Sequence, residues 1–358
     1  MDPKLQQLFE HTVTSKASDL HLRVGVPPVI RVDGSLNFIT SFNTLSAPEI
    51  EAMIVSIISP NQRELLVENR SLDFSYDYLQ NVQLEAKARF RINIFYQRGT
   101  LAAAFRLLPA KVKTIEELYL PKACHTLAGL KQGLVLVTGP TGHGKTTTLA
   151  AMVNEINMTR TDNIITIEDP VEYVYPKGRS IISQRELGHD TYSWAESMKS
   201  LLREDPDVVL IGEMRDPESI ASAITIAETG HLVFSTLHTN SASQTIDRIT
   251  DSFPPHQQNQ IRTQLASTLQ GIISQRLLPQ IGGGRIMASE VLIATNAVQS
   301  NIREGKTHMI ESIMETSQDA GMYTLESSLA QLVQQGKITR EIALQYAARP
   351  EELIRLIA

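Results

Sequence analysis

Residues 134–146 read Leu-Val-Leu-Val-Thr-Gly-Pro-Thr-Gly-His-Gly-Lys-Thr, and this stretch decides the fold class. Its first part is a short apolar run, which is typical of a buried parallel strand. Its second part, Gly139–Thr146, matches the phosphate-binding loop pattern, and the next residues predict a helix from about Thr147 to Asn157. Because strand, loop and helix follow one another directly, the sequence predicts an α/β core that binds a nucleoside triphosphate.

The residue types of this loop suit phosphate chemistry. Glycines let backbone N–H groups turn inward around the phosphates, and the helix N-terminus adds positive potential. Lys145 would place a point charge on the outer phosphates, and the Thr146 hydroxyl would bind Mg²⁺. The residues that we expect to contact the nucleotide are Gly139, Pro140, Thr141, Gly142, His143, Gly144, Lys145, Thr146 and Thr147.

Three further apolar runs end in polar side chains. Residues 164–167 lead into Glu168, residues 208–211 lead into Glu213, and the strand that begins at His231 ends near His238. Because the carboxyl ends of parallel strands meet the ligand in an α/β sheet, these ends predict a catalytic site beside the phosphate loop. Glu213 is in addition a candidate partner for Mg²⁺.

Two arginines flank the strand that ends at Glu213. Arg203 and Arg215 could neutralise charge that develops on the transferred phosphoryl group, in the same subunit or a neighbouring one. They could equally be ordinary surface arginines at helix ends.

The first hundred residues predict a smaller domain that mixes helices with strands. Ser46 and Glu49 form one predicted capping box, and Asn61 and Glu64 repeat the pattern for a second short helix. Residues 88–107 alternate apolar and polar side chains around a turn, which predicts a hairpin with one buried face. Its other face would carry three arginines: Arg89, Arg91 and Arg106. This face could be an ordinary solvated sheet surface, or an arginine cluster offered to a phosphate.

A proline-bounded polar stretch marks the expected domain boundary. We predict an N-terminal domain at 1–108, a linker at 109–120, and the nucleotide-binding domain with a C-terminal helical region at 121–358. The length of 358 residues agrees with this division at roughly 150 residues per domain. In the C-terminal region, Leu325, Leu329, Leu332 and Val333 fall on one helical face.

Composition excludes several classes of protein. No run approaches the roughly 18 apolar residues of a membrane helix, and the first residues lack the pattern of a signal peptide. We therefore expect a cytoplasmic protein that does not insert into the membrane. The net charge of −6, without basic stretches interleaved with aromatics, disfavours a nucleic-acid partner. The single cysteine, Cys124, cannot form an internal disulfide or a multi-cysteine zinc site.

Four boxes in order resemble the secretion-type ATPases of type IV pilus and type II secretion machines. They are the phosphate loop, residues 167–173, residues 203–216, and residues 229–238, and Ser18–Leu22 resembles the family's N-terminal signature. Within the family the chain is most similar to the pilus retraction ATPases. Extension and secretion ATPases usually carry a longer N-terminus and a four-cysteine zinc module, and Gly282-Gly283-Gly284 stands where that module is expected.

The resemblance implies a PAS-like N-terminal domain followed by a RecA-like ATPase core with C-terminal helices. It implies a homohexamer that hydrolyses ATP with Mg²⁺ to drive pilus retraction and twitching motility. The expected partner is the inner-membrane pilus platform protein, with a paralogous retraction ATPase as a further partner, so the ring would lie at the inner face of the cytoplasmic membrane. The resemblance also implies that ATP binds between the two domains, in a site that a neighbouring subunit completes.

The resemblance also implies roles for single residues. Glu168 would orient the attacking water and Glu213 would support Mg²⁺, although the sequence leaves the order of these two glutamates open. His231 and His238 would couple the nucleotide state to domain position. The hairpin arginines match positions near interdomain and trans nucleotide contacts.

Two departures keep alternatives open. His143 stands where the family has a small hydroxyl residue, and the segment 297–304 lacks the first arginine of a motif that is frequent in retraction ATPases. An accessory retraction paralogue and another secretion-family motor therefore remain alternatives. A nucleotide-gated binding protein and a RecA-like nucleic-acid motor are the alternatives from other classes.

Overall fold

The protein is described here by a computed structural model that covers residues 1–32, 34–79, 87–109 and 111–358. These residues form two compact units. The first comprises Met1–Lys111 and Asp169–Val174, and the second comprises Val112–Glu168 and Tyr175–Ala358. The first boundary between the units, Lys111/Val112, falls inside the predicted linker 109–120. Residue 110 of that linker lies outside the described residues. The rest of the predicted linker, from Val112 on, belongs to the second unit, and Val112 and Ile115 are buried there.

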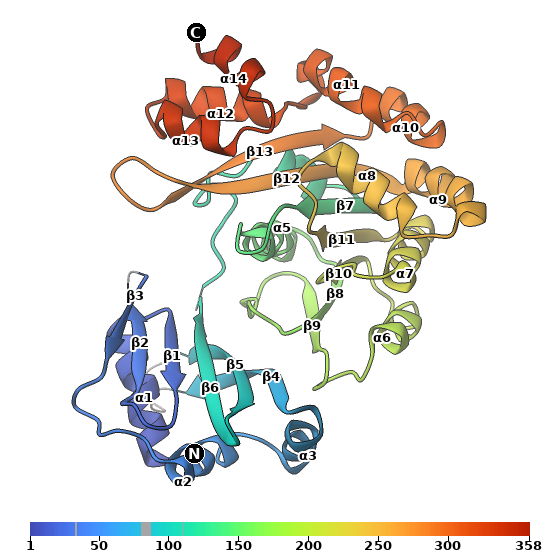
Figure 1. Ribbon diagram of the computed structural model, residues 1–358. Coiled ribbons are helices and arrows are strands. Elements are labelled where there is room, and N and C mark those ends of the chain that lie inside the picture. The colour runs from blue at the N-terminus through green and yellow to red at the C-terminus, as the bar shows by residue number, and fades with distance from the viewer. Residues whose placement is uncertain (33, 80–86, 110) are drawn as a thin grey trace. The chain divides into compact units, whose positions relative to one another are not determined.

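The first unit is an antiparallel sheet with strand order β3-β2-β1-β6-β5-β4 (Figure 1). Its elements are α1 (Pro3–Thr14), β1 (Asp19–Leu22), β2 (Val29–Val32), β3 (Ser35–Phe38), α2 (Ala47–Val55), α3 (Pro60–Asn69), β4 (Ser71–Leu79), β5 (Lys87–Gln97) and β6 (Thr100–Leu108). Apolar residues of the three helices pack on one face of the sheet, against Phe90, Ile92 and Phe105. The sequence prediction of a β5–β6 hairpin with an apolar face is confirmed, because Arg91 and Arg106 are cross-strand partners that point away from this core.

The second unit is a mainly parallel sheet with strand order β13-β12-β7-β11-β10-β8-β9. Within this sheet, β12–β13 is the one antiparallel pair among the described strands. The strands are β7 (Gly133–Thr138), β8 (Asn163–Glu168), β9 (Ile181–Glu186), β10 (Val208–Ile211), β11 (Leu232–Leu237), β12 (Leu269–Pro279) and β13 (Arg285–Ile293). The expected α/β class is thus confirmed, with an antiparallel sheet in the first unit and a mixed sheet in the second.

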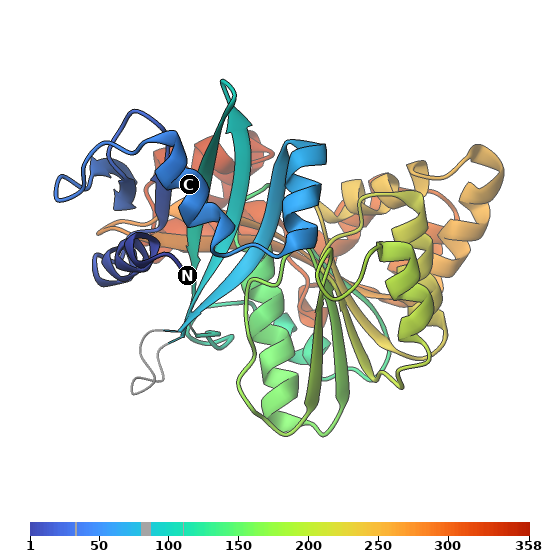
Figure 2. The same cartoon turned by 90° about the horizontal axis from the view of Figure 1, so that it is seen from below.

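Helices cover both faces of this second sheet, as Figure 2 shows for α5 on one side and α6 and α7 on the other. The helices are α4 (Ala123–Ala128), α5 (Lys145–Thr159), α6 (Trp194–Leu201), α7 (Pro217–Glu228), α8 (Ala242–Asp251), α9 (Pro255–Thr268), α10 (Asn296–Arg303), α11 (Ile310–Thr316), α12 (Leu325–Gln334), α13 (Arg340–Tyr346) and α14 (Pro350–Ile357), with short 3₁₀ turns at Thr307–Met309 and Gln318–Ala320. Leu325 and Leu329 of α12, on the predicted apolar face, pack in one apolar cluster with Leu278 of β12 and Ala288 of β13, which Ala343 of α13 and Leu353 of α14 join.

Two predicted helix boundaries were wrong. The helix after the phosphate loop begins at Lys145 and not at Thr147, because Gly144 adopts a φ of 84° as its N-cap residue. Helix α3 is capped by Ser59 with Gln62, and not by Asn61 with Glu64. Pro60 explains the second error, because a proline without an N–H group fits the first helical position. No helix in the described ranges is long and apolar enough to cross a bilayer.

Candidate nucleotide site

The candidate site lies at one edge of the second sheet, where the parallel strands β7, β11, β10 and β8 end. The phosphate loop follows β7 and leads into α5, so backbone N–H groups and the positive end of a helix gather at this edge. Lys145 is buried, and its Nζ donates to the carbonyl oxygens of Gly139 (2.8 Å) and Pro140 (3.1 Å). The ammonium group is thus held inside the loop, where phosphates would sit.

Gln275 of β12 holds the phosphate loop through side-chain hydrogen bonds. The sequence did not point to this residue. Its side chain accepts a hydrogen bond from Thr148 (2.9 Å) and donates one to the carbonyl oxygen of His143 (2.7 Å). A Cβ atom on Gly139 would lie 2.3 Å from the backbone carbonyl oxygen of Gln275, so position 139 requires glycine. No motif surrounds Gln275 in the sequence, because only the pairing of β12 with β7 brings it to the loop.

His143 also anchors the loop to β12. Its Nδ1 accepts a hydrogen bond from the backbone N–H of Leu277 (3.0 Å). Burial, and then the positive charges of Arg276, Lys145 and Arg285, lower the pKa of His143. The imidazole therefore stays neutral near pH 7, and its side chain binds the protein rather than facing only solvent.

A line of polar contacts connects the ends of β10 and β11 to the loop. Glu213 forms an ion pair with Arg215, and its carboxylate lies within hydrogen-bond distance of the Nε2 of His238, at 3.1 Å. The Nδ1 of His238 lies 3.3 Å from the hydroxyl of Thr141 and 3.5 Å from the Nζ of Lys145. The structure thus brings Glu213 and His238, which the sequence predicted separately, into contact with the phosphate loop, and Arg215 joins them through Glu213.

Glu168 is at the end of β8 and is 5% exposed. Its Oε1 accepts hydrogen bonds from the hydroxyl of Thr166 (2.7 Å) and from the amide of Gln184 (3.3 Å). Sequence reasoning missed both donors. Thr166 could have been found, since it precedes Glu168 by two residues and so shares its side of the strand.

Two predicted site residues lie elsewhere. His231 precedes β11, while His238 follows it, so six strand residues, a rise of roughly 20 Å, separate them. The ring of His231 contacts Thr229 and the carbonyl oxygen of Ile226, and not the phosphate loop. Arg203 is exposed at the end of α6, before β10 begins, so it too lies at the opposite end of the parallel strands.

The three hairpin arginines are in ion pairs with carboxylates of the first unit. Arg106 binds Asp19 at 3.0 Å, Arg91 binds Asp73 at 2.8 Å, and Arg89 binds Asp77 at 2.7 Å. Arg89 also donates to the carbonyl oxygen of Val171 (3.1 Å), and Arg91 lies 3.8 Å from Glu172. Both of these residues belong to the segment that follows Glu168 in the chain and is part of the first unit.

A groove of about 1240 Å³ opens beside the phosphate loop within the second unit. Its lining includes Gly144 and Thr147 from the loop and α5, Gln275, and Tyr119 and Ser327 from flanking segments. Pockets of roughly 300–1000 Å³ hold typical small ligands, so this groove has room for the rest of a nucleotide whose phosphates lie on the loop.

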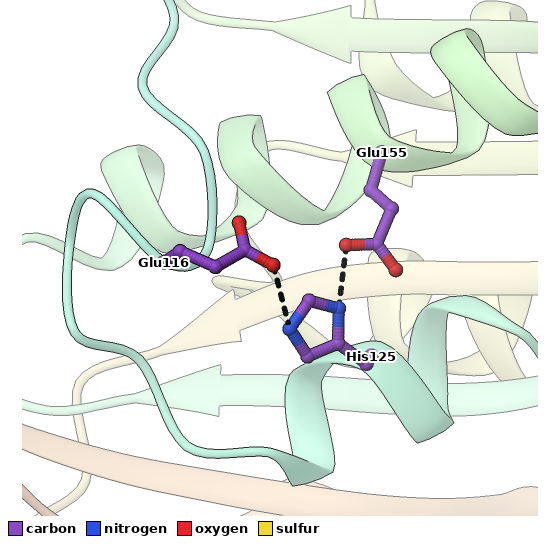
Figure 3. A group of neighbouring side chains, drawn as sticks. All are labelled: Glu116, His125 and Glu155. Carbon is purple, nitrogen blue, oxygen red and sulfur yellow. Dashed lines mark hydrogen bonds and ion pairs between the residues drawn. The ribbon is translucent and has the colours of Figure 1, made fainter.

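The described residues also contain one cluster of three side chains with metal-ligand chemistry, apart from the phosphate loop. His125 of α4 lies between two carboxylates, with Nε2 3.2 Å from Glu116 and Nδ1 2.7 Å from Glu155 of α5 (Figure 3). Each carboxylate faces a different ring nitrogen. As it stands, the His125 ring therefore bridges two carboxylates from different segments of the second unit.

The chain is similar to known proteins over most of its length. The family described as "Type II/IV secretion system protein" matches residues 2–351. The chain belongs to this family. It is 44% identical over 347 residues to the "Type IV pilus retractation ATPase PilT" of Pseudomonas aeruginosa, covering 97% of this chain and 99% of that protein. It is 47% identical over 327 residues to a "Twitching motility protein" of Neisseria gonorrhoeae, covering 91% of this chain and 86% of that protein.

The fold agrees as well. The crystal structure described as "the Pilus Retraction Motor PilT and Bound ADP" matches with a TM-score of 0.89 and 46% identity, covering 98% of both chains. This member of the secretion ATPase family is thus a homologue of the pilus retraction ATPases, as the sequence boxes predicted.

Proposed function

We propose that the chain hydrolyses ATP to power the retraction of type IV pili. The observation that carries the proposal is the phosphate loop with Lys145, His238 and Glu213 in contact around it, in a chain that matches retraction ATPases over its whole length. We further propose that the chain acts as a homohexameric ring in the cytoplasm, at the inner face of the membrane, on the pilus platform protein. In finer fold terms, we propose a PAS-like first unit and a RecA-like second unit.

The proposed reaction is transfer of the γ-phosphoryl group to water. Glu168 would orient the attacking water and accept its proton, as the bond from the water oxygen to phosphorus forms and the bond to the β–γ bridging oxygen breaks. Lys145 and the loop N–H groups would balance the charge on the phosphates, and ADP and phosphate would leave.

Mg²⁺ fits the donors at this edge. The Thr146 hydroxyl at the start of α5 and the Glu213 carboxylate are oxygen donors, which is the chemistry that Mg²⁺ prefers. Glu213 already contacts His238 and Arg215, so these residues would hold its carboxylate in place. A bound Mg²⁺ would neutralise charge on the β- and γ-phosphates.

Two substitutions test the nucleotide assignment. Lys145→Ala should lower the ATPase rate by at least about 100-fold, because the loop loses its one point charge on the phosphates.

Glu168→Gln should keep ATP affinity within about twofold while turnover stops. Lys131→Ala, at an exposed lysine before β7, serves as the control and should leave the rate unchanged. Most of the activity remaining in Lys145→Ala would contradict the assignment.

Retraction itself is tested in cells. A strain that lacks this chain and expresses Glu168→Gln should carry excess pili that extend but do not retract, when labelled pili are imaged. The same strain with the unaltered chain should retract them. Normal retraction in the Glu168→Gln strain would contradict the proposal.

A further inference from the structure

The buried Thr166 and Glu168 and the half-buried Gln184 form a polar trio on one face of the second sheet. Thr166 and Gln184 are cross-strand partners in the parallel β8–β9 pair, and Glu168 follows two residues after Thr166. Side chains at such positions point to the same side of a sheet. Both donors reach the same oxygen of Glu168, Oε1.

The direction of each hydrogen bond is fixed by its surroundings. The Gln184 Oε1 accepts from the backbone N–H of Tyr175 (3.3 Å), so the amide nitrogen is the end that faces Glu168. The Thr166 side chain is fully buried, and its hydroxyl is a donor because an ionised carboxylate can only accept. Both side chains therefore donate to Glu168.

We propose that Thr166 and Gln184 are positioning residues that orient Glu168 for the attack of water on ATP. This inference rests on the proposed role of Glu168 as the residue that orients the water. Two donors on Oε1 fix the plane of the carboxylate and hence the position of its second oxygen. A carboxylate that rotated freely would meet the water in the correct geometry for only part of the time.

A purely structural role predicts a different result from a positioning role. Thr166 could serve only to satisfy its own buried hydroxyl. In that case its loss would lower stability and would leave the turnover of the folded protein unchanged. Kinetics of the folded variants therefore separate the two roles, provided that kcat and KM are measured individually.

The test compares three threonine variants in the full chain. Thr166→Val removes the donor and should lower kcat about tenfold or more, with KM for ATP and nucleotide affinity within about twofold. Thr166→Ser keeps a hydroxyl and should restore kcat to within about threefold of the unaltered chain. Thr250→Val is the matched control, since it removes a buried hydroxyl that bonds only a helix carbonyl in α8 at 3.0 Å, and its kcat should not change.

Gln184→Met gives an independent arm if Thr166→Val fails to fold. Gln184 is less buried, and methionine keeps its length without a donor. Its kcat should fall about threefold to tenfold at unchanged nucleotide affinity. The inference is overturned if folded Thr166→Val keeps kcat within twofold of normal. Where Thr166→Val does not fold, the same result in Gln184→Met overturns it. A Thr166→Ser variant as slow as Thr166→Val also overturns it.

Glu168→Gln separates failure of this inference from failure of the proposed function. If Glu168→Gln still turns over ATP, the proposed role of Glu168 is wrong, and the inference loses its basis. If Glu168→Gln stops turnover while the Thr166 and Gln184 variants remain fast, only the positioning role is wrong.

Discussion

His143 is the residue at which this phosphate loop departs from the family pattern, and the structure gives it a specific partner. Its Nδ1 accepts from the N–H of Leu277, and its backbone carbonyl accepts from Gln275. Because burial and nearby cations lower the pKa of His143, the proton that would break the Leu277 bond binds only at lower pH. The bond is intact above the ordinary histidine pKa of 6.5 and is lost as the pH falls through the lowered value.

A pair of substitutions at His143 tests this anchor. His143→Leu leaves the Leu277 N–H without an acceptor, and we expect KM for ATP at pH 7.5 to rise about three- to tenfold. His143→Asn places a neutral acceptor near the position of Nδ1 and should keep KM within about twofold. Steady-state ATPase kinetics measure both. Equal KM values for the two variants would show that the bond to Leu277 does not support nucleotide binding.

Among the elements, the contact between β13 and α8 carries a buried acid. Glu290 of β13 accepts a hydrogen bond from the N–H of Ala242 (2.6 Å) at the start of α8. Burial raises the pKa of Glu290 to about 7, with Glu311 and Glu326 adding to the rise, against the Ala242 bond and Arg349. The pKa of Glu290 in the folded protein thus lies above the ordinary value of 4.5. The contribution of protonated Glu290 to the free energy of unfolding is therefore fully present below pH 4.5 and is lost as the pH rises through about 7.

Glu290→Gln should therefore stabilise the protein mainly at high pH. Glutamine keeps an acceptor for Ala242 and carries no charge, so we expect a gain on the order of 3 kcal/mol at pH 8 and much less at pH 5. Thermal unfolding midpoints at the two pH values measure it. The exposed Glu351→Gln is the control and should change neither midpoint appreciably. A gain that is equal at pH 5 and pH 8 would contradict the buried-charge explanation.

Elements with a local signal could be predicted from the sequence, and contacts between distant strands could not. The phosphate loop, the ends of β8, β10 and β11, and the alternation along β5 all depend on residues close in the chain. Gln184 and Gln275 reach the site only because β9 and β12 take their places in the sheet. The His231 prediction stays untested, and its position at the far end of β11 separates it from the loop.

At the scale of the whole molecule, the open question is whether the arginines of the first unit serve a neighbouring copy. Arg106 has the most exposed side chain of the three, at 68%, and its partner Asp19 lies in the segment that resembles the family's N-terminal signature. Asp19 is buried, and it also accepts a hydrogen bond from the Ser18 hydroxyl (2.8 Å) and lies 3.8 Å from Arg31, so it keeps polar partners if Arg106 turns to a phosphate. The pairing seen within the first unit is therefore compatible with either interpretation, a solvated sheet face or a phosphate contact in trans.

Mixing two inactive variants distinguishes these interpretations. If Arg106 completes a neighbour's site, Arg106→Ala should lower kcat about tenfold or more at unchanged ATP affinity, whereas Arg63→Ala, at another exposed arginine of the first unit, should not. Mixed rings of Arg106→Ala and Lys145→Ala should then regain activity, because some sites combine an intact Lys145 with an intact Arg106 from the next copy. An Arg106→Ala variant as fast as the unaltered chain identifies the solvated face instead. Inactive variants that stay inactive when subunits exchange would mean that both residues serve the same copy's site.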